Sequence, residues 1–456
     1  MHHTRLRTSS LRASARGAAI AQIMAAALAA VEPAAAVSRH LRRDGDTLHA
    51  GERTIDLHTI ERVFLVGAGK AGAPMAHAAA AILGDRLTAG LVIVKEGHLA
   101  EFAPTFQRVA LVEAGHPIPD ERGIAAAAQI AAMLHGLTPR DLVIALISGG
   151  GSALLTLPAP GVSLTDLQTL TGALLACGAS IGAINTLRKH LDMLKGGGLA
   201  RLAHPAALVT LILSDVVGNP LASIASGPTV ADPSTFADAL AVLERHQLMS
   251  SAPPAIVAHL RQGRAGALPE TLKAGDVRLA GVSNVLVGDN RQAATAALTA
   301  ARALGFHALL LTTALEGEAR DAGRFLAAML REVDASGNPL PRPACLIIGG
   351  ETTVTLRGAG HGGRNQELAL AAAPLLAGLP DVALVALATD GGDGPTDAAG
   401  AVVTGATAER ARALGLDLAA HLARNDAYPC FAALDDLLRP GPTGTNVNDL
   451  TFLFAW

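Results

Sequence analysis

The sequence predicts an α/β protein made of two α/β domains, a Rossmann-like N-terminal domain with a mostly parallel sheet and a smaller C-terminal domain. Short β-branched runs alternate with longer Ala- and Leu-rich stretches, which is typical of βα units wound around a parallel sheet. The chain has 456 residues, too many for one small core. Gly, Ser and Asp gather directly after several predicted strands. Because ligands bind at the carboxyl ends of parallel strands, we expect the active site in the cleft between the domains.

The individual elements follow from local composition. Strands are predicted from short runs rich in Val, Ile and Leu between turn residues. They cover residues 62–66, 91–95, 108–112, 142–147, 207–213, 285–287, 308–312, 344–348, 382–388 and 450–454. Helices are predicted where Ala, Leu and charged residues continue over about ten or more positions. They cover residues 11–31, 70–83, 121–134, 164–176, 181–194, 290–304, 318–333 and 364–376.

Residues 251–280 predict a linker between the domains. They contain Pro253, Pro254 and several glycines but no strand pattern. We therefore assign residues 1–250 to the N-terminal domain and residues 281–456 to the C-terminal domain. The chain's N-terminal part carries several Arg and Ser before any acidic residue, which an organellar transit peptide also does. Its Ala-rich stretch is better explained as a helix whose apolar side chains pack against the protein.

Composition excludes several classes of protein. Lys and Arg number 36 against 39 Asp and Glu, and aromatic residues make up 2%, which argues against nucleic-acid binding. No apolar run reaches the ~18–20 residues of a membrane helix without Gly, Pro or charge. The three cysteines lie far apart, which fits a reducing compartment and argues against structural zinc. We expect a cytoplasmic enzyme that acts on small molecules, and the sequence leaves open whether it forms a homo-oligomer.

A run of glycines follows the predicted strand 142–147. It consists of Ser148, Gly149, Gly150, Gly151 and Ser152. Glycine-rich turns let backbone N–H groups approach an anion, and the start of a following helix adds partial positive charge. We therefore predict that these residues bind phosphate. The alternative is a tight turn without a ligand, although so many glycines are costly for a turn alone.

The pattern GxGxxG begins at Gly67, between a strand and a helix. With Glu96 beyond the next strand, it is typical of dinucleotide binding and would suit a nicotinamide-dependent reductase. Lys70 inside the turn and Lys95 beside Glu96 favour phosphoryl transfer instead, because a Lys neutralises the transferring oxygens. We predict Gly67 and Gly69 to bind phosphate and Lys70 to be catalytic, with dinucleotide binding as the alternative.

Acidic residues just past predicted strands suggest a divalent ion. They are Asp215, Asp390 and Asp393. Mg²⁺ is usually held by one or two carboxylates together with substrate phosphates and waters. We predict these three as Mg²⁺ ligands, with Glu351 as a further candidate. The alternative is that each of them caps a helix or closes a turn.

Basic residues near two helices are candidates for anion recognition. Arg364 follows a Gly-rich approach at a helix start, where a guanidinium can bind a carboxylate or phosphate bidentately. We predict Arg364 to be catalytic and its neighbour Asn365 to bind substrate. Arg188 and Lys195 belong to a basic run that ends in glycines, and we predict that they bind substrate and phosphate, respectively. The alternative is that this run only complements the negative end of a helix dipole.

His98 and His116 follow strands in loops. Each could line an acid-binding pocket or act as a base, and we predict His116 to bind substrate. The alternative is a structural role in the loop. The sequence contains no HExxH, P-loop, HRD/DFG pair or GxSxG elbow, which argues against zinc proteases, P-loop enzymes, protein kinases and α/β-hydrolases.

Together these loops resemble the glycerate 2-kinase family, the type II or MOFRL-type glycerate kinases that are often named hydroxypyruvate reductases. The matching segments occur in order over nearly the whole chain. They are VGAGKAG (66–72), EAGHPIPDERG (113–123), SGGGSALL (148–155), NTLRKHLDMLKGGGLA (185–200), SDVVGNPLASIASGPTVAD (214–232), GGETTVT (349–355), GGRNQE (362–367), TDGGDGPTDAAG (389–400) and GPTGTNVNDL (441–450).

The resemblance implies ATP- and Mg²⁺-dependent phosphorylation of (R)-glycerate to 2-phosphoglycerate and ADP, in a cleft between two domains. It also implies catalytic roles for Lys70 and Arg364. In the resulting hypothesis the glycerate hydroxyl attacks in line, Lys70 stabilises the transferred group, and Arg364 orients the glycerate carboxylate or the γ-phosphate. Two alternatives stay open: an NAD(P)H-dependent hydroxypyruvate reductase, and a protein that binds a nucleotide or sugar acid without turnover.

Overall fold

The computed structural model describes residues 6–99 and 108–456, and the chain divides into two compact units. One unit is Pro33–Val287, and the other joins Met1–Glu32 to Gly288–Trp456. The predicted α/β class is confirmed, whereas the predicted domain boundaries differ from this division.

The Pro33–Val287 unit is built on a six-stranded sheet with the order β6-β5-β4-β7-β8-β9. Its strands are β4 (Arg62–Ala68), β5 (Leu87–Lys95), β6 (Val109–Ala114), β7 (Asp141–Ile147), β8 (Ala207–Leu213) and β9 (Val282–Gly288). Neighbouring strands from β6 to β8 pair in parallel, which confirms the predicted mostly parallel sheet. Every residue of β7 is buried, as expected for a central strand covered on both faces. The carboxyl ends of these parallel strands lie along one edge.

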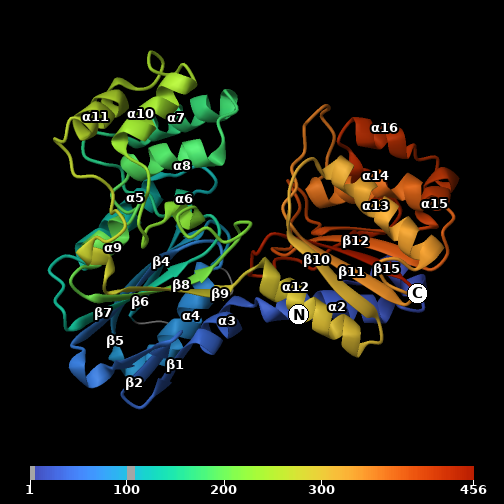
Figure 1. Cartoon of the computed structure of the whole chain (residues 1–456), viewed down its shortest axis with the longest axis horizontal. Coiled ribbons are helices and arrows are strands. Elements are labelled where there is room, and N and C mark those ends of the chain that lie inside the picture. Colours follow the sequence, from blue (N-terminus) through green and yellow to red (C-terminus); the bar gives the residue numbers. More distant parts are fainter. Residues whose placement is uncertain (1–5, 100–107) are drawn as a thin grey trace. The chain divides into compact units, whose positions relative to one another are not determined.

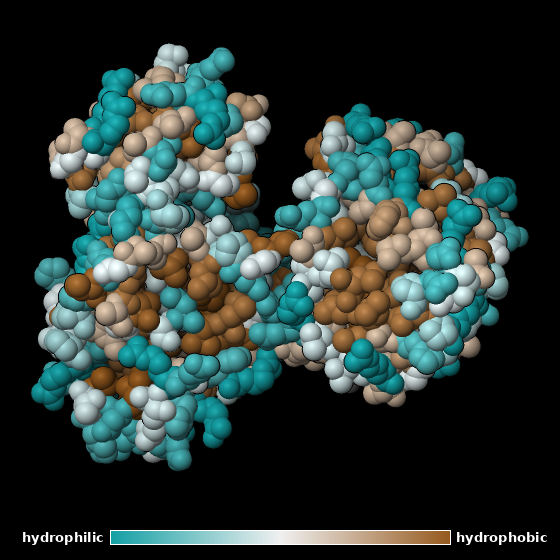
Figure 2. Space-filling view, viewed as in Figure 1, coloured by the Kyte–Doolittle hydropathy of each residue, from teal (hydrophilic) through white to brown (hydrophobic). Residues whose placement is uncertain are grey.

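The helices of this unit include a separate group with a core of its own. The unit's helices are α3 (Pro33–His40), α4 (Gly72–Leu83), α5 (Glu121–Met133), α6 (Gly151–Leu154), α7 (Leu164–Ala176), α8 (Ile181–His190), α9 (Gly198–Ala203), α10 (Phe236–Arg245) and α11 (Pro254–Arg264). Helices α7, α8, α10 and α11 gather around their own apolar core, which includes Phe236 (Figure 1). Capping boxes start α7 at Ser163 and α10 at Thr235. Figure 2 shows many hydrophilic side chains on the viewed face of this group.

Residues 251–280 belong to this unit, so the predicted linker is wrong. They contain α11, whose Ile256 and Leu260 are fully buried in the core of the helical group. Pro253 is the N-cap and Pro254 opens the helix, a position where a missing N–H costs nothing. The prolines therefore start a helix. A small antiparallel sheet in the same unit was not predicted. Its strands are β1 (Leu41–Asp44), β2 (Thr47–Ala50) and β3 (Arg53–Asp56).

The other unit contains a mixed six-stranded sheet with the order β10-β11-β15-β12-β13-β14. Its strands are β10 (His307–Leu315), β11 (Ala344–Gly350), β12 (Val382–Ala388), β13 (Gly400–Thr404), β14 (Leu437–Leu438) and β15 (Asp449–Ala455). The last strand, β15, pairs antiparallel with both β11 and β12. Its insertion there makes the sheet mixed.

Helices cover both faces of this sheet. They are α1 (Ser9–Ala13), α2 (Gly17–Ala30), α12 (Asn290–Ala303), α13 (Ala319–Ser336), α14 (Arg364–Leu376), α15 (Thr407–Ala413), α16 (Leu418–Ala423) and α17 (Ala427–Ala433). Helices α13 and α14 lie on one face, and α12 lies with α2 on the opposite face (Figure 1). The side chains of β11, β12, α13 and α14 share one apolar core.

Helices α1 and α2 belong to the unit with the mixed sheet, so their predicted place in the N-terminal domain is wrong. Ser10 donates through its backbone N–H and its hydroxyl to Asp436, at 2.8 and 2.7 Å. Thr445 donates to the carbonyl of Val31 at 2.6 Å. The apolar side chains of α2, such as Ile20, are buried, which confirms the predicted packing helix. Contacts between segments so distant in sequence leave no local pattern.

Among residues 6–99 and 108–456, no single helix is long and apolar enough to cross a membrane. The bent pair of α2 and α3 (Pro33–His40) passes that test jointly, on length and composition alone.

Candidate active site

Basic and glycine-rich loops of the Pro33–Val287 unit meet at the carboxyl-end edge of the parallel sheet. Lys70 follows β4, Lys95 ends β5 and His116 follows β6. Gly150, in the turn after β7, comes close to this group: a Cβ there would lie 2.8 Å from the His116 ring and 3.5 Å from Lys70 Cγ. The Nδ1 atom of His98 lies 3.1 Å from the Lys70 carbonyl oxygen. The structure thus brings together basic side chains that belong to separate loops.

His116 lies near the basic side chains of Lys70, Lys95 and His98. Burial lowers the pKa of His116 to about 4, and the charges of Lys70, Lys95 and His98 act in the same direction. The imidazole is therefore neutral at pH 7 and can donate one hydrogen bond. An anion placed here would meet two ammonium groups. The position suits the predicted substrate-binding role of His116.

The turn that begins at Gly67 packs tightly against the turn after β7. A Cβ at Gly67 would lie 2.2 Å from the Leu146 carbonyl oxygen, and one at Gly69 2.0 Å from Ser148 Oγ. Every N–H from Gly69 to Gly72 already donates inside the protein. The pairs are Gly69 N to Ile93 O, Lys70 N to Gly149 O, Ala71 N to Ser148 Oγ and Gly72 N to Gly69 O, at 3.0, 2.8, 3.0 and 3.0 Å. The N–H of Gly69 is therefore engaged inside the protein, and the phosphate-binding role of Gly67 and Gly69 stays a prediction.

Two N–H groups in the turn after β7 lack a partner. In the part of the chain that the structure describes, nothing accepts a hydrogen bond from the N–H of Gly149 or Gly150. Gly150 adopts φ +81° and precedes the short helix α6, while Gly151 N–H donates to the Ser148 carbonyl at 3.1 Å. Ser148 is buried and holds the neighbouring turn rather than facing a ligand. Of the predicted phosphate-binding residues 148–152, Gly149 and Gly150 therefore have N–H groups available for a ligand, and Ser152 lies beside them.

A pocket of about 40 Å³ is lined by Ser152 and by residues of α7 and α8. Its lining is mostly apolar, and Arg188 is one of its polar members. Within the described ranges the guanidinium of Arg188 makes no hydrogen bond or ion pair, and burial alone lowers its pKa. A half-buried guanidinium without a partner is unfavourable until an anion joins it. The pocket therefore suits a carboxylate or phosphate, as the predicted substrate-binding role of Arg188 requires.

Lys195 lines the same pocket but has no donor to spare. Its Nζ donates to the carbonyl of Leu155 at 2.8 Å, to Thr156 Oγ1 at 3.2 Å and to Asp192 Oδ2 at 2.5 Å. An ammonium group has three N–H donors, and all three are used here. Lys195 thus ties two buried segments together, and its phosphate-binding role stays a prediction.

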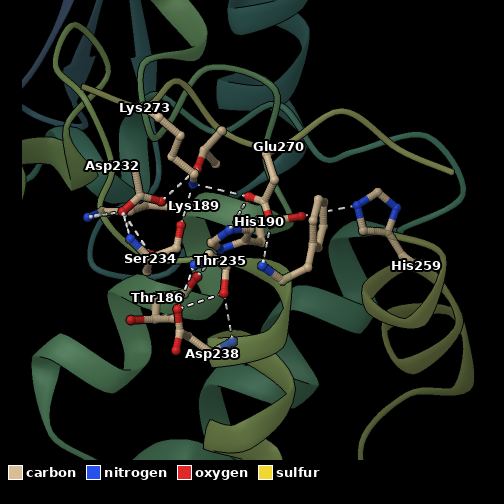
Figure 3. A network of polar contacts seen from close by, with 12 residues as sticks. Thr186, Lys189, His190, Asp232, Ser234, Thr235, Asp238, His259, Glu270 and Lys273 are labelled. Atoms are coloured by element: carbon tan, nitrogen blue, oxygen red, sulfur yellow. Dashed lines mark hydrogen bonds and ion pairs between the residues drawn. The ribbon is translucent and has the colours of Figure 1, made fainter. Parts of the chain in front are cut away.

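The two basic residues after Arg188 pair with acidic side chains (Figure 3). Lys189 Nζ lies 3.2 Å from Asp232 Oδ1, and His190 Nε2 lies 3.2 Å from Glu270 Oε2. Figure 3 shows both side chains inside a network that joins α8 to α10. The predicted basic run thus has two functions: Lys189 and His190 anchor the last turn of α8, and Arg188 lines the pocket.

Ser152 is linked to two residues that we did not predict as site residues. Ser152 Oγ lies 2.7 Å from Ser226 Oγ, and Ser226 Oγ donates to Asn185 Oδ1 at 3.2 Å. Ser226 and Ala225 adopt φ +60° and +48°. Non-glycine residues in this conformation cost on the order of 1–3 kcal/mol each and cluster at functional sites. In the sequence, Ser226 could have been found as a candidate site residue through the segment SDVVGNPLASIASGPTVAD, which carries part of the family resemblance.

A second cluster lies in the unit with the mixed sheet, around Arg364 at the start of α14. Arg364 donates from Nε and Nη2 to Asp449, at 2.5 and 3.0 Å, and from Nη1 to Glu351 at 2.6 Å. Burial opposes the charge, yet these two carboxylates raise the pKa of Arg364 above its ordinary value. Burial raises the pKa of Asp449. The guanidinium is therefore already engaged, and Asp449 is a partner that the sequence did not single out.

Asp393 and Asn365 are part of the scaffold around Arg364. Asp393 accepts hydrogen bonds from the N–H groups of Asn365 and Gln366, at 3.1 and 2.9 Å, and so caps α14. Its burial raises its pKa to about 7. These hydrogen bonds agree with the helix-capping alternative, and the role of Asp393 as a Mg²⁺ ligand stays a prediction. The Asn365 side chain is buried, and its Nδ2 lies 3.4 Å from Asp393 Oδ1, so it supports the cap. Its substrate-binding role stays a prediction.

The remaining acidic candidates do not form a ready metal site. In the described ranges no group of three or more His, Cys, Asp or Glu side chains is placed to hold a metal ion. Asp215 follows β8, and Asp390 follows β12 in the other unit, where its Oδ1 accepts the N–H of Gly392 at 3.1 Å.

The fold is that of an α/β protein with basic and glycine-rich loops at its strand ends, the edge where ligands of such folds bind. Residues 19–261 match a domain of unknown function, DUF4147, and residues 344–449 match the MOFRL family. The D-glycerate 2-kinase of Thermotoga maritima is 45% identical over 88% of this chain and 92% of its own length. The glycerate kinase of Homo sapiens is 39% identical over 95% of this chain and 92% of its own length.

The chain belongs to the glycerate kinase family. A solved crystal structure of a T. maritima glycerate kinase has a TM-score of 0.84 and 42% identity, covering 95% of this chain and 98% of that chain. An Agrobacterium vitis relative carries, with a provisional qualifier, the name hydroxypyruvate reductase; it is 46% identical over 85% of this chain and 86% of its own length.

Proposed function

We propose that this protein transfers the γ-phosphoryl group of ATP to the 2-hydroxyl of D-glycerate, giving 2-phosphoglycerate and ADP. The relatives named D-glycerate 2-kinase and glycerate kinase support this activity. The structural observation that carries it is Arg188, a half-buried guanidinium without a partner in the described ranges, in a pocket with Ser152. Glycerate offers a carboxylate to the guanidinium and a hydroxyl to the serine.

Each group in the Pro33–Val287 unit takes a role that its chemistry allows. Arg188 binds the glycerate carboxylate. The N–H groups of Gly149 and Gly150 bind phosphate oxygens, and neutral His116 donates a further hydrogen bond. Lys70 stabilises the charge on the transferred group, since positioning and electrostatics supply most of the catalysis in phosphoryl transfer.

Mg²⁺ is proposed to enter with ATP, where it neutralises the charge of the phosphate oxygens. Asp215, which follows β8 in the same unit as Lys70, is the carboxylate proposed to join it. Asp390 belongs to the other unit and stays a separate candidate. Arg364 is proposed to hold Asp449 and Glu351 in place, because all three of its hydrogen bonds already go to these two acids.

Nicotinamide-dependent reduction of hydroxypyruvate is the competing function. It rests on the GxGxxG pattern and on the name of the A. vitis relative. A bound dinucleotide needs N–H groups of that turn for its pyrophosphate, and those of Gly69 to Gly72 donate inside the protein instead. The phosphotransferase function leaves no such conflict.

The test is to mix the purified protein with D-glycerate, ATP and Mg²⁺, follow ADP, and pass the product to enolase. ADP release with immediate formation of phosphoenolpyruvate is the expected result. ADP release that needs phosphoglycerate mutase before enolase acts would make the product 3-phosphoglycerate. Oxidation of NADH with hydroxypyruvate, without ADP release, would replace the proposal with the reductase.

A further inference from the structure

Ser152, Ser226 and Asn185 form a chain of hydrogen bonds whose direction is fixed by burial. Ser226 has 0% of its surface exposed, so its hydroxyl is confined to the two partners that it contacts. Asn185 Oδ1 can only accept, and the proton of Ser226 therefore points to it. The Ser226 oxygen then accepts from Ser152. The hydroxyl proton of Ser152 is consequently used inside the protein.

Ser152 therefore faces the pocket as a hydrogen-bond acceptor. Ser226 is the one partner of its hydroxyl among the described residues, and the side chain lines the same pocket as Arg188. A ligand hydroxyl can donate to this oxygen. A ligand carbonyl cannot pair with it unless the chain reverses, and reversal would leave the buried Oδ1 of Asn185 without a donor.

We propose that Ser152, held as an acceptor by Ser226 and Asn185, selects a 2-hydroxy acid over the corresponding 2-keto acid in the Arg188 pocket. Arg188 binds the carboxylate of either acid, so the discrimination comes from the serine. This inference rests on the proposed function, because glycerate and hydroxypyruvate differ only at the carbon next to the carboxylate. Binding the keto acid would reverse these hydrogen bonds and leave the Asn185 oxygen without a donor. We therefore expect the hydroxy acid to bind about 10- to 100-fold more tightly than the keto acid.

The variant Ser226→Ala tests the direction of the chain. Alanine suits this backbone, because the preceding Ala225 also adopts a positive φ. In the variant the Ser152 proton has no internal acceptor and can turn to a ligand carbonyl. We expect the ratio of the hydroxypyruvate inhibition constant to the glycerate KM to fall about tenfold, measured by ADP release. Circular dichroism checks that the variant is folded.

Two controls separate this effect from a general change of the pocket. Thr171 lines the same pocket but is not part of the Ser152–Ser226–Asn185 hydrogen bonds. Thr171→Val is therefore expected to leave the ratio of the hydroxypyruvate inhibition constant to the glycerate KM unchanged. The inhibitor 3-hydroxypropionate has no oxygen at the second carbon, and its inhibition constant is expected to be the same in wild type and Ser226→Ala. An equal gain for both inhibitors, or an unchanged ratio in Ser226→Ala, would overturn the inference while glycerate phosphorylation stands. A wild-type protein that releases no ADP with glycerate would overturn the proposed function and this inference with it.

Discussion

Arg188 and Arg364 both lie next to glycine-rich loops, yet the structure uses them in opposite ways. Arg364 gives three hydrogen bonds to Asp449 and Glu351. The guanidinium of Arg188 makes none within the described ranges, and the side chain lines a pocket. An arginine that is already neutralised positions its partners and stabilises the fold, whereas an unpaired one is available to a ligand. Variants of the two should therefore fail in different ways.

The largest expected effect is on the stability of the unit that contains Arg364. Arg364→Met removes the charge partner of Asp449, whose side chain is 8% exposed. Breaking a buried ion pair from one side costs about 3–5 kcal/mol of unfolding free energy. The chain's one tryptophan, Trp456, belongs to the same unit, so its fluorescence in a urea titration reports the loss.

The matched control is Arg324→Met on α13. Arg324 pairs with Asp321 at 3.3 Å on the surface, and such exposed pairs contribute at most about 1 kcal/mol. If Arg364→Met instead kept the wild-type urea midpoint and lost more than about 100-fold in kcat, Arg364 would act on the reacting groups, as the family resemblance implied.

Lys70 and Lys195 can be compared in the same way as the two arginines. Lys70→Met is expected to lower kcat by about 10²–10³, because one charge contact to the transferred group is lost, with an unchanged circular dichroism spectrum. Lys195→Met is the contrast, since it would leave Asp192 buried without its partner and lower stability instead. A Lys70→Met protein with near-normal kcat would contradict the proposed role.

Arg188→Met should lower kcat/KM for glycerate by about 10- to 100-fold, mainly through KM, since a charged hydrogen bond to the carboxylate is lost. Its thermal midpoint should be unchanged or higher, because a cation without a partner is removed from a partly buried position. Arg188→Lys keeps the charge and should recover part of the loss. A marked drop in stability would show that Arg188 has a structural partner.

The sequence predicted the groups that parallel strands carry to one edge, because that placement follows from strand direction alone. Lys70, His116 and Gly150 meet for this reason. It could not predict that the turns of Gly67 and Gly149 use each other's hydrogen-bonding groups, since that depends on their separation in space. Composition likewise cannot distinguish a lysine that meets a ligand from one that holds three internal acceptors.

Long-range pairing explains the other differences. The last strand, β15, enters the sheet between β11 and β12 and carries Asp449 to Arg364, which no local pattern indicates. Asp393 was predicted as a metal ligand because it follows a strand. It became a helix cap because Gly363 lets it approach α14, where a Cβ at Gly363 would lie 2.3 Å from Asp393 Cγ.

The smallest expected effect is a shift in the pKa of His116 when an anion binds. Burial first, and then its cationic neighbours, hold this pKa at about 4, so His116 is neutral in the folded protein while an unfolded chain would protonate near pH 6.5. The unfolded state thus binds more protons between these values, and the contribution of His116 to stability is complete above about pH 6.5 and declines toward pH 4.

A phosphate group beside Lys70 and Lys95 would offset their repulsion of the protonated His116 and raise the pKa of His116 by about one unit. Inorganic phosphate should therefore inhibit up to about tenfold more strongly as pH falls through this window, and His116→Gln should remove that dependence. An identical pH profile in the variant would place the anion away from His116.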